Sequence, residues 1–214
     1  MASVLTVTVD TDGVTLPGDL VVPGQARAMV LFAHGSGSSR LSPRNTAVAR
    51  GLTRAGFGTL LFDLLTGAEE RADARDATLR FDIALLARRL SGAIGWLERQ
   101  QVARGLPLGL FGASTGAAAA LATAARLPGQ VRAVVSRGGR PDLAGAALGQ
   151  VRAPVLLIVG GRDTRVRSLN EAARRDLKAT SELAVVAGAG HLFEEPTALD
   201  QVTALAANWF TRHI

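Results

Sequence analysis

Short runs of Val, Leu and Ile alternate with longer amphipathic stretches along the whole of this 214-residue chain. Gly, Pro or Asp bounds each apolar run, and such alternation is typical of a mostly parallel β-sheet covered by helices. The pattern predicts strands at residues 4–10, 15–23, 28–35, 58–65, 106–114, 131–137, 154–161 and 182–189. It predicts helices at about 43–55, 78–101, 115–126, 142–149, 167–177 and 196–213.

These elements predict one α/β domain over residues 1–214, with an eight-stranded sheet and no large lid domain. The first two strands have no helix between them, so we expect them to pair as an antiparallel edge, whereas crossovers separate the other six. The charged segment 66–80 is predicted to be a surface loop. An apolar stripe on the last helix should lie on the sheet, with Pro196 in the first turn of that helix. The stripe consists of Leu199, Val202, Leu205, Ala206 and Trp209.

The composition removes several kinds of chemistry. The chain has no cysteine, which excludes a disulfide framework, a catalytic thiol and thiolate metal sites. Its three histidines are far apart in sequence, so no metal is expected, and no other cofactor either. The N-terminal sequence does not show a basic segment followed by a long apolar run. No apolar stretch approaches the roughly 18 residues of a membrane helix. We therefore expect a cytoplasmic protein without a membrane partner.

The positive charge of the chain comes almost entirely from arginine. The formal net charge is +6, and an excess of basic over acidic residues can indicate a nucleic-acid partner. Here the arginines are scattered, and many alternate with acids or recur at helical spacing, as in "RADARDATLR". This distribution favours solvated helix faces, and no nucleic-acid partner is expected. The sequence leaves a homo-oligomer possible, since the first strand could present a free edge.

One serine occupies a position typical of a nucleophile. Gly112-Ala113-Ser114-Thr115-Gly116 matches G-x-S-x-G where a predicted strand ends and a helix begins. Small neighbours allow a strand and a helix to approach closely around such a turn. The alternative is an ordinary serine in a corner of small residues. The choice depends on whether the chain also supplies a base and an acid.

The base and the acid can be sought by position. His34 precedes the serine and His213 is the penultimate residue, which leaves His191, directly after the last predicted strand. Asp163 follows the penultimate strand and lies between Ser114 and His191, the chain order of the α/β-hydrolase plan. Asp163 has an alternative role as a helix cap or turn residue. Two other acids compete for the role, but Asp142 precedes a short helix and Glu182 begins a strand.

Acyl transfer also needs donors for an oxyanion. We predict the backbone N–H of Thr115, at the start of the helix, as one donor. Ser36, flanked by glycines in "AHGSGSSR", is predicted to supply the second, and His34 is given a structural role. A dinucleotide-binding interpretation of this loop fails because Arg40 stands where the last glycine is needed.

Four motifs together resemble one superfamily. "FAHGSG", "GASTG", "GGRD" and "GAGH", in this order over essentially the whole chain, resemble the α/β-hydrolase superfamily, in its dienelactone-hydrolase-like branch. The resemblance implies Ser114 as nucleophile, Asp163 as acid and His191 as base. Dienelactone hydrolases proper use cysteine as nucleophile, so the implied activity is hydrolysis of small carboxylic esters by a serine enzyme. The alternatives are an acyltransferase, a thioesterase or a non-catalytic binding protein on the same scaffold.

Arg137 is a further candidate because it ends a predicted strand at the edge where such sheets bind ligands. It could hold a substrate carboxylate through paired hydrogen bonds. The alternative is a structural ion pair with Asp142 or another acid. Asp63 ends a strand in the same way and is predicted to be a structural hydrogen-bonding residue.

Overall fold

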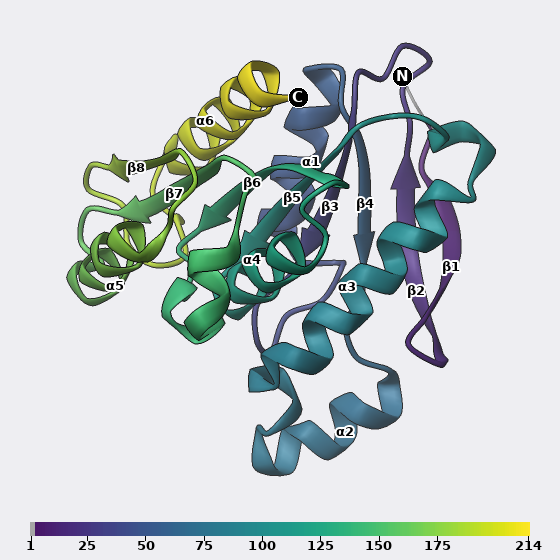
Figure 1. Cartoon of the computed structure of the whole chain (residues 1–214), viewed down its shortest axis with the longest axis horizontal. Helices are drawn as coiled ribbons and strands as arrows, with labels where there is room; N and C mark the ends of the chain where they lie inside the picture. Colours follow the sequence, from purple (N-terminus) through teal and green to yellow (C-terminus); the bar gives the residue numbers. More distant parts are fainter. Residues whose placement is uncertain (1–2) are drawn as a thin grey trace.

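The computed structural model describes residues 3–214 and contains one eight-stranded sheet with the spatial order β1-β2-β4-β3-β5-β6-β7-β8 (Figure 1). The strands are β1 (Leu5–Thr11), β2 (Val14–Val21), β3 (Met29–Ala33), β4 (Gly58–Phe62), β5 (Leu108–Ala113), β6 (Val131–Arg137), β7 (Val155–Gly160) and β8 (Ser181–Val186). All eight predicted strands are present, which confirms the predicted sheet.

The predicted antiparallel edge is also confirmed. β1 pairs antiparallel with β2, and β2 pairs antiparallel with β4. Asp12 and Gly13 both have positive φ, 48° and 75°, in the two-residue turn that joins β1 to β2. The other six strands pair in parallel. Parallel pairing brings the carboxyl ends of these six strands to one edge of the sheet.

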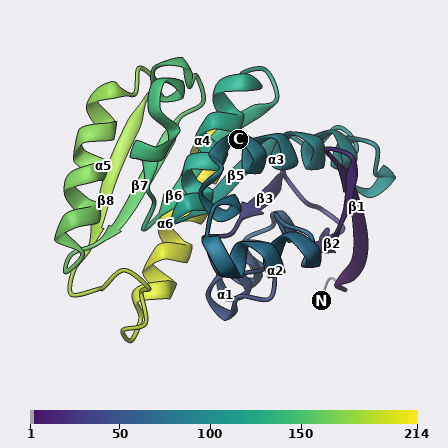
Figure 2. The same ribbon diagram turned by 90° about the horizontal axis from the view of Figure 1, so that it is seen from below.

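Helices cover both faces of the sheet. They are α1 (Pro43–Arg54), α2 (Gly67–Asp76), α3 (Ile83–Glu98), α4 (Thr115–Arg126), α5 (Thr164–Asp176) and α6 (Ala198–His213). The face that carries α3 and α4 has its own apolar core, and α1 and α6 pack with a second core on the opposite face (Figure 2). No helix among residues 3–214 is long and apolar enough to cross a membrane.

The stripe predicted for α6 lies on the sheet. Val202, Ala206 and Trp209 are fully buried in the core shared with α1. The prediction for Pro196 is wrong, because α6 begins at Ala198 after Thr197 and the proline precedes the helix.

The prediction of a surface loop at 66–80 is wrong. This segment contains α2, which lies beyond the carboxyl ends of β3 and β4 (Figure 1), and the short 3-10 turn η1 (Leu79–Phe81). A capping box starts α2: the Thr66 side chain accepts from the Glu69 N–H, and the Glu69 carboxylate accepts from the Thr66 N–H. The same carboxylate pairs with the buried Arg89 of α3. These bonds fix a helix whose residues are too polar to be identified by apolar periodicity.

Other predicted helix boundaries shift for local reasons. The helix predicted at 78–101 is shorter, because Asp82 caps α3 and a 3-10 turn, η2 (Gln101–Ala103), follows it. The helix predicted at 142–149 is a 3-10 segment, η3 (Pro141–Gln150), broken at Gly145, where φ is 52°. Its hydrogen bonds and backbone differ from those of the predicted α-helix.

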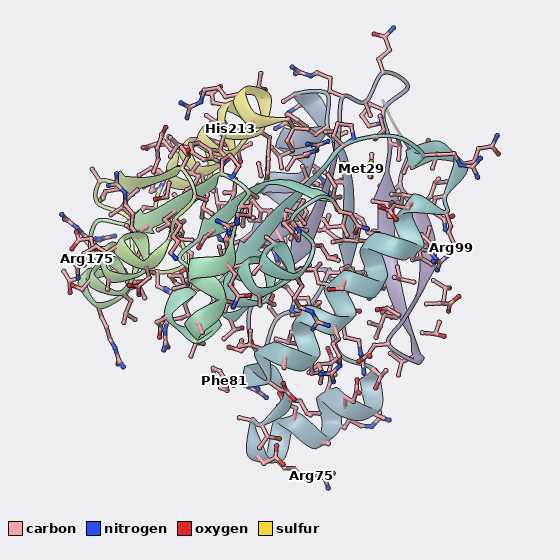
Figure 3. The ribbon with its side chains drawn as sticks, in the orientation of Figure 1. Met29, Arg75, Phe81, Arg99, Arg175 and His213 are labelled. Carbon is pink, nitrogen blue, oxygen red and sulfur yellow. The ribbon has the colours of Figure 1, made fainter. Side chains whose placement is uncertain are left out.

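Exposed arginines are spread over several elements, as the sequence predicts. Arg75 on α2, Arg99 at the end of α3 and Arg175 on α5 point outward at separate parts of the surface (Figure 3). These positive charges are therefore solvated individually.

Two glycines let α4 pack directly against the sheet. A Cβ atom at Gly112 would lie 2.4 Å from the Ala117 Cα, and one at Gly116 would lie 2.1 Å from the Ala33 carbonyl oxygen. Neither distance leaves room for an atom. The approach confirms the need for small residues around Ser114, because any larger side chain would lift the helix off the strand.

His34 ties the loop after β3 to the end of β4. Its ring is buried, its Nε2 accepts from the Leu64 N–H at 3.0 Å, and its Nδ1 lies 3.0 Å from the Gly35 carbonyl oxygen. Asp63 acts beside it by accepting from the backbone N–H and the guanidinium of Arg40. The predicted structural roles of both residues are thus visible as hydrogen bonds, and both hold the loop that follows β3.

We expect Gly116→Ala to lower the free energy of unfolding by about 2–3 kcal/mol, because the new methyl group overpacks the contact with Ala33. Urea denaturation measures this change. The matched control is Gly129→Ala, where a Cβ meets nothing within 4 Å, and its effect should stay under about 1 kcal/mol. Equal effects of the two substitutions would contradict the packing argument.

Burial lowers the pKa of His34 below its ordinary value of 6.5. The unfolded chain therefore binds a proton at this residue more readily than the folded protein does, and stability falls as the pH drops below about 6.5. We expect His34→Gln, which keeps an acceptor for the Leu64 N–H and does not titrate, to show a shallower loss of stability between pH 7 and pH 5. Denaturation at several pH values, compared with the native chain, measures the difference. Parallel pH profiles would show that His34 does not carry this dependence.

Candidate active site

Ser114 stands on a strained turn between β5 and α4. Its backbone angles are φ 51° and ψ −121°, a sparsely populated conformation that costs on the order of 1–3 kcal/mol in a residue with a side chain. Its N–H donates to the Arg137 carbonyl oxygen at 3.2 Å, and its own carbonyl accepts from Ala117 and Arg140, both at 3.1 Å. These bonds hold the turn in place. The Ser114 Oγ makes no hydrogen bond with any residue among 3–214, so it is not used as a helix cap.

Asp163 and His191 come together at the same edge of the sheet. Asp163 follows β7 and caps α5, and His191 follows β8. The Asp163 Oδ2 lies 2.6 Å from the His191 Nδ1. The other oxygen, Oδ1, accepts from the Val166 N–H at 3.3 Å. The cap role and the histidine contact, alternatives from the sequence alone, are therefore both present in one carboxylate.

This bond determines how the imidazole can act. A carboxylate only accepts hydrogen bonds, so the proton of the bond is on Nδ1 and the Nε2 lone pair of a neutral ring stays free. The His191 side chain is 41% exposed, whereas that of Asp163 is 15% exposed. Solvent can therefore reach the ring. The two competing acids are engaged elsewhere, since Asp142 pairs with Arg140 and Glu182 pairs with Arg212.

The loop after β3 packs against the serine turn. A Cβ at Gly35 would lie 3.0 Å from the Ser114 Cβ, which shows how closely the loop approaches. Thr115 is the first residue of α4. The backbone N–H groups of Ser36 and Thr115 have no acceptor among the residues that the structure describes. Both residues line one cavity.

A cavity of about 460 Å³ opens beside these two donors. Its walls come from the loop after β3, the start of α1, the end of β4 and the α2–η1 segment. Four charged side chains line it: Arg44, Glu70, Asp73 and Arg80. Ser114, Asp163 and His191 are not part of its lining, although Thr115, the residue after the serine, is.

Sequence reasoning missed the charged residues that α2 and η1 bring to this cavity. Arg80 forms an ion pair with the buried carboxylate of Asp73, and its backbone N–H donates a hydrogen bond to the same carboxylate. The capping sequence from Thr66 to Glu69 was the available signal for the helix. Identifying it would have placed Glu70 and Asp73 on one ordered element near the carboxyl edge of the sheet.

Arg137 is buried and unpaired. Its exposed fraction is 7%, and no carboxylate of residues 3–214 lies within ion-pair distance of it. The alternative pairing with Asp142 is wrong, because Arg140 holds both oxygens of that carboxylate. Burial lowers the pKa of Arg137 to about 10, and the charge of the nearby Arg44 adds to the effect. The guanidinium is thus a desolvated cation without a counterion in this part of the protein.

Comparisons with known proteins agree with this architecture. The model of the dienelactone hydrolase family matches residues 17–213. The crystal structure of a dienelactone hydrolase from Anabaena variabilis is 53% identical, with a TM-score of 0.97, and the match covers 100% of this chain and 99% of the other. An esterase structure from Pyrococcus furiosus, at 16% identity, shares the fold with a TM-score of 0.76 over 99% of this chain and 92% of its own.

The curated relatives are longer than this chain. Two Mycobacterium tuberculosis proteins, each named "Putative phosphoribosyl transferase", are 58% identical over 201 residues, which are 94% of this chain and 44% of theirs. The chain thus spans less than half the length of these relatives, and their name describes proteins that contain much more. Because the family model covers most of the chain and a structure half identical to it bears the same family's name, this α/β-hydrolase domain belongs to the dienelactone hydrolase family.

Proposed function

We propose that the protein is a serine hydrolase of small carboxylic esters, with Ser114 as nucleophile, His191 as base and Asp163 as orienting acid. The observation that carries the proposal is the 2.6 Å contact between Asp163 and His191 at the edge of the sheet where the strained Ser114 turn stands. Family membership supports a hydrolase, and the absence of cysteine from the sequence requires another nucleophile. Serine is the residue at the turn.

The chemistry follows from the groups at this edge. The Ser114 Oγ attacks the ester carbonyl carbon while its proton passes to the His191 Nε2. The resulting oxyanion accepts from the N–H groups of Ser36 and Thr115. When the tetrahedral species collapses, the carbon–oxygen bond to the alcohol breaks and His191 returns the proton to that alcohol. Water then attacks the acyl-enzyme with His191 as base, which releases the acid and restores Ser114.

Each alternative uses these groups differently. An acyltransferase would pass the same acyl group to an acceptor other than water, and a thioesterase would expel a thiol. A binding protein would need no activated serine. The free donors at Ser36 and Thr115 and the oriented His191 favour catalysis, because unpaired polar groups and strained backbone cost stability. The transferase name belongs to longer relatives, and this chain matches only 44% of their length.

Labelling with a fluorophosphonate tests the nucleophile. We expect one covalent adduct on the native chain and none on Ser114→Ala, because only a serine with a neighbouring base attacks phosphorus at a useful rate. Intact mass spectrometry measures both. Ser168→Ala, on the exposed face of α5, is the matched control and should label like the native chain. An adduct that survives in Ser114→Ala, or none on the native chain, would exclude this nucleophile.

Asp163→Asn tests the orienting acid. Asparagine can still cap α5 through Val166, so the melting temperature should change little. It lacks the negative charge that holds the Nδ1 proton of His191, and we expect kcat on a neutral ester such as p-nitrophenyl butyrate to fall at least about a thousandfold. A well-folded variant with near-native kcat would assign the acid role to another residue.

A further inference from the structure

We propose that Glu195, held by Arg162, is a positioning residue that fixes His191 against Asp163. This inference rests on the proposed ester hydrolysis, because it assigns a support to the base and the acid of that reaction. Neither Glu195 nor Arg162 lines the cavity beside the serine turn. The role proposed for them is therefore exerted through the two loops that carry Asp163 and His191.

The first observation concerns the histidine loop, residues 187–197 between β8 and α6. The backbone N–H groups of His191 and Leu192 have no acceptor among residues 3–214. Two residues of this loop that are not glycine have a left-handed backbone, Phe193 with φ 55° and Thr197 with φ 64°. The Phe193 ring is buried in the core shared with α1 and α6. A strained loop of this kind keeps one conformation only where other contacts hold it.

The second observation is that Glu195 supplies such a contact. Its Oε1 accepts from the backbone N–H of Gly190, the residue before His191, at 3.0 Å. The same oxygen pairs with the guanidinium of Arg162, the residue before Asp163. Hydrogen bonds from its own backbone N–H and from that of Gly190 lower the pKa of Glu195, so the carboxylate is ionised at neutral pH. One oxygen atom thus joins the residue before the base to the residue before the acid.

The third observation is that few other contacts tie these two loops together. β7 and β8 are neighbouring parallel strands (Figure 1), and the Arg162 N–H donates to the Ala189 carbonyl oxygen at 2.9 Å. Beyond Ala189 the ties are made by side chains. Apart from the Asp163–His191 contact itself, the pair between Glu195 and Arg162 is the only ion pair between these loops in residues 3–214. The bridge is therefore placed to control where the imidazole stands.

The exposure of the pair separates this role from a general contribution to stability. The Arg162 side chain is 63% exposed and that of Glu195 is 31% exposed. Exposed ion pairs contribute little to the stability of the whole protein. The geometry of the reacting groups is more sensitive, because a misplacement of about 1 Å can cost on the order of a hundredfold in rate. Loss of the bridge should therefore lower kcat in a protein that remains folded.

Kinetics of three variants test the bridge. Glu195→Ala removes both contacts of Oε1, and we expect kcat on p-nitrophenyl butyrate to fall about tenfold to a hundredfold. KM and the melting temperature should change little. Arg162→Met leaves the Gly190 contact in place, so its kcat should fall by a smaller factor. The double variant should lose no more than Glu195→Ala alone, because Arg162 acts only through Glu195.

The matched control is Arg167→Met. Arg167 forms an exposed ion pair with Glu171 on α5 and contacts neither loop, so this variant should keep the native kcat. Additive losses in the double variant would show that Arg162 and Glu195 act independently. That result, or a native kcat in Glu195→Ala, would overturn the positioning role.

The tautomer of His191 gives a second measurement, one that a merely structural role would not move. Nitrogen NMR of the imidazole rings distinguishes a proton on Nδ1 from one on Nε2, and the chain has only three histidines to assign. We expect the neutral His191 ring of the native chain to carry its proton on Nδ1, facing Asp163. Glu195→Ala should populate the Nε2–H form of His191 and leave His34 unchanged. A folded Glu195→Ala with the native tautomer would contradict the proposal.

This measurement also separates the inference from the proposed function, because it does not depend on turnover. If the native chain neither labels with a fluorophosphonate nor cleaves esters, while Glu195→Ala still changes the His191 tautomer, the hydrolysis fails and the positioning role stands. If the native chain labels and Glu195→Ala labels at the same rate with an unchanged tautomer, the hydrolysis stands and the positioning role fails.

Discussion

The approach of α4 to the sheet determines where the candidate site can form. With no room for a Cβ at Gly112 or Gly116, the chain must turn within one residue from β5 into the helix, and Ser114 takes the strained backbone angles. The turn then places the start of α4, at Thr115, at the carboxyl end of β5. Parallel pairing brings the ends of β3, β7 and β8 to the same edge, where Ser36, Asp163 and His191 lie. One packing contact and one topology thus assemble residues that are up to 155 positions apart in the chain, from Ser36 to His191 (191 − 36).

The sequence predicts the sheet and the Asp163–His191 contact well because both depend on simple rules. Buried parallel strands are continuous apolar runs, and polar residues directly after them must meet at the carboxyl edge. The α2 segment was missed because its order depends on the capping box at Thr66 and on the pair between Glu69 and Arg89, which are side-chain contacts rather than a periodic pattern. The kink in η3 depends on a single left-handed backbone angle, at Gly145, which no periodicity encodes.

Arg137 shows a different limit of sequence reasoning. From the sequence, an ion pair with Asp142 was an open possibility, since Arg137 ends a strand and Asp142 follows the same strand. In the structure Asp142 pairs with Arg140 instead. The two residues are two positions apart, so the Arg140 guanidinium reaches both carboxylate oxygens from the same turn. The burial of Arg137 follows from the alternation of side chains along β6, which places it with Val135 on the α1 side. Which charges remain unpaired is therefore decided by tertiary geometry.

Paired and unpaired polar groups have different roles around the candidate site. Arg40 with Asp63 and Arg80 with Asp73 pair charges that hold the loop after β3 and the α2–η1 segment in position. The N–H groups of Ser36 and Thr115 and the Nη1 of Arg137 lack such partners in the described chain. Some unpaired atoms lie elsewhere, the Trp209 Nε1 among them. The N–H groups of Ser36 and Thr115 differ because both residues line one cavity beside the Ser114 turn, where a single bound molecule with a developing oxyanion would meet both donors.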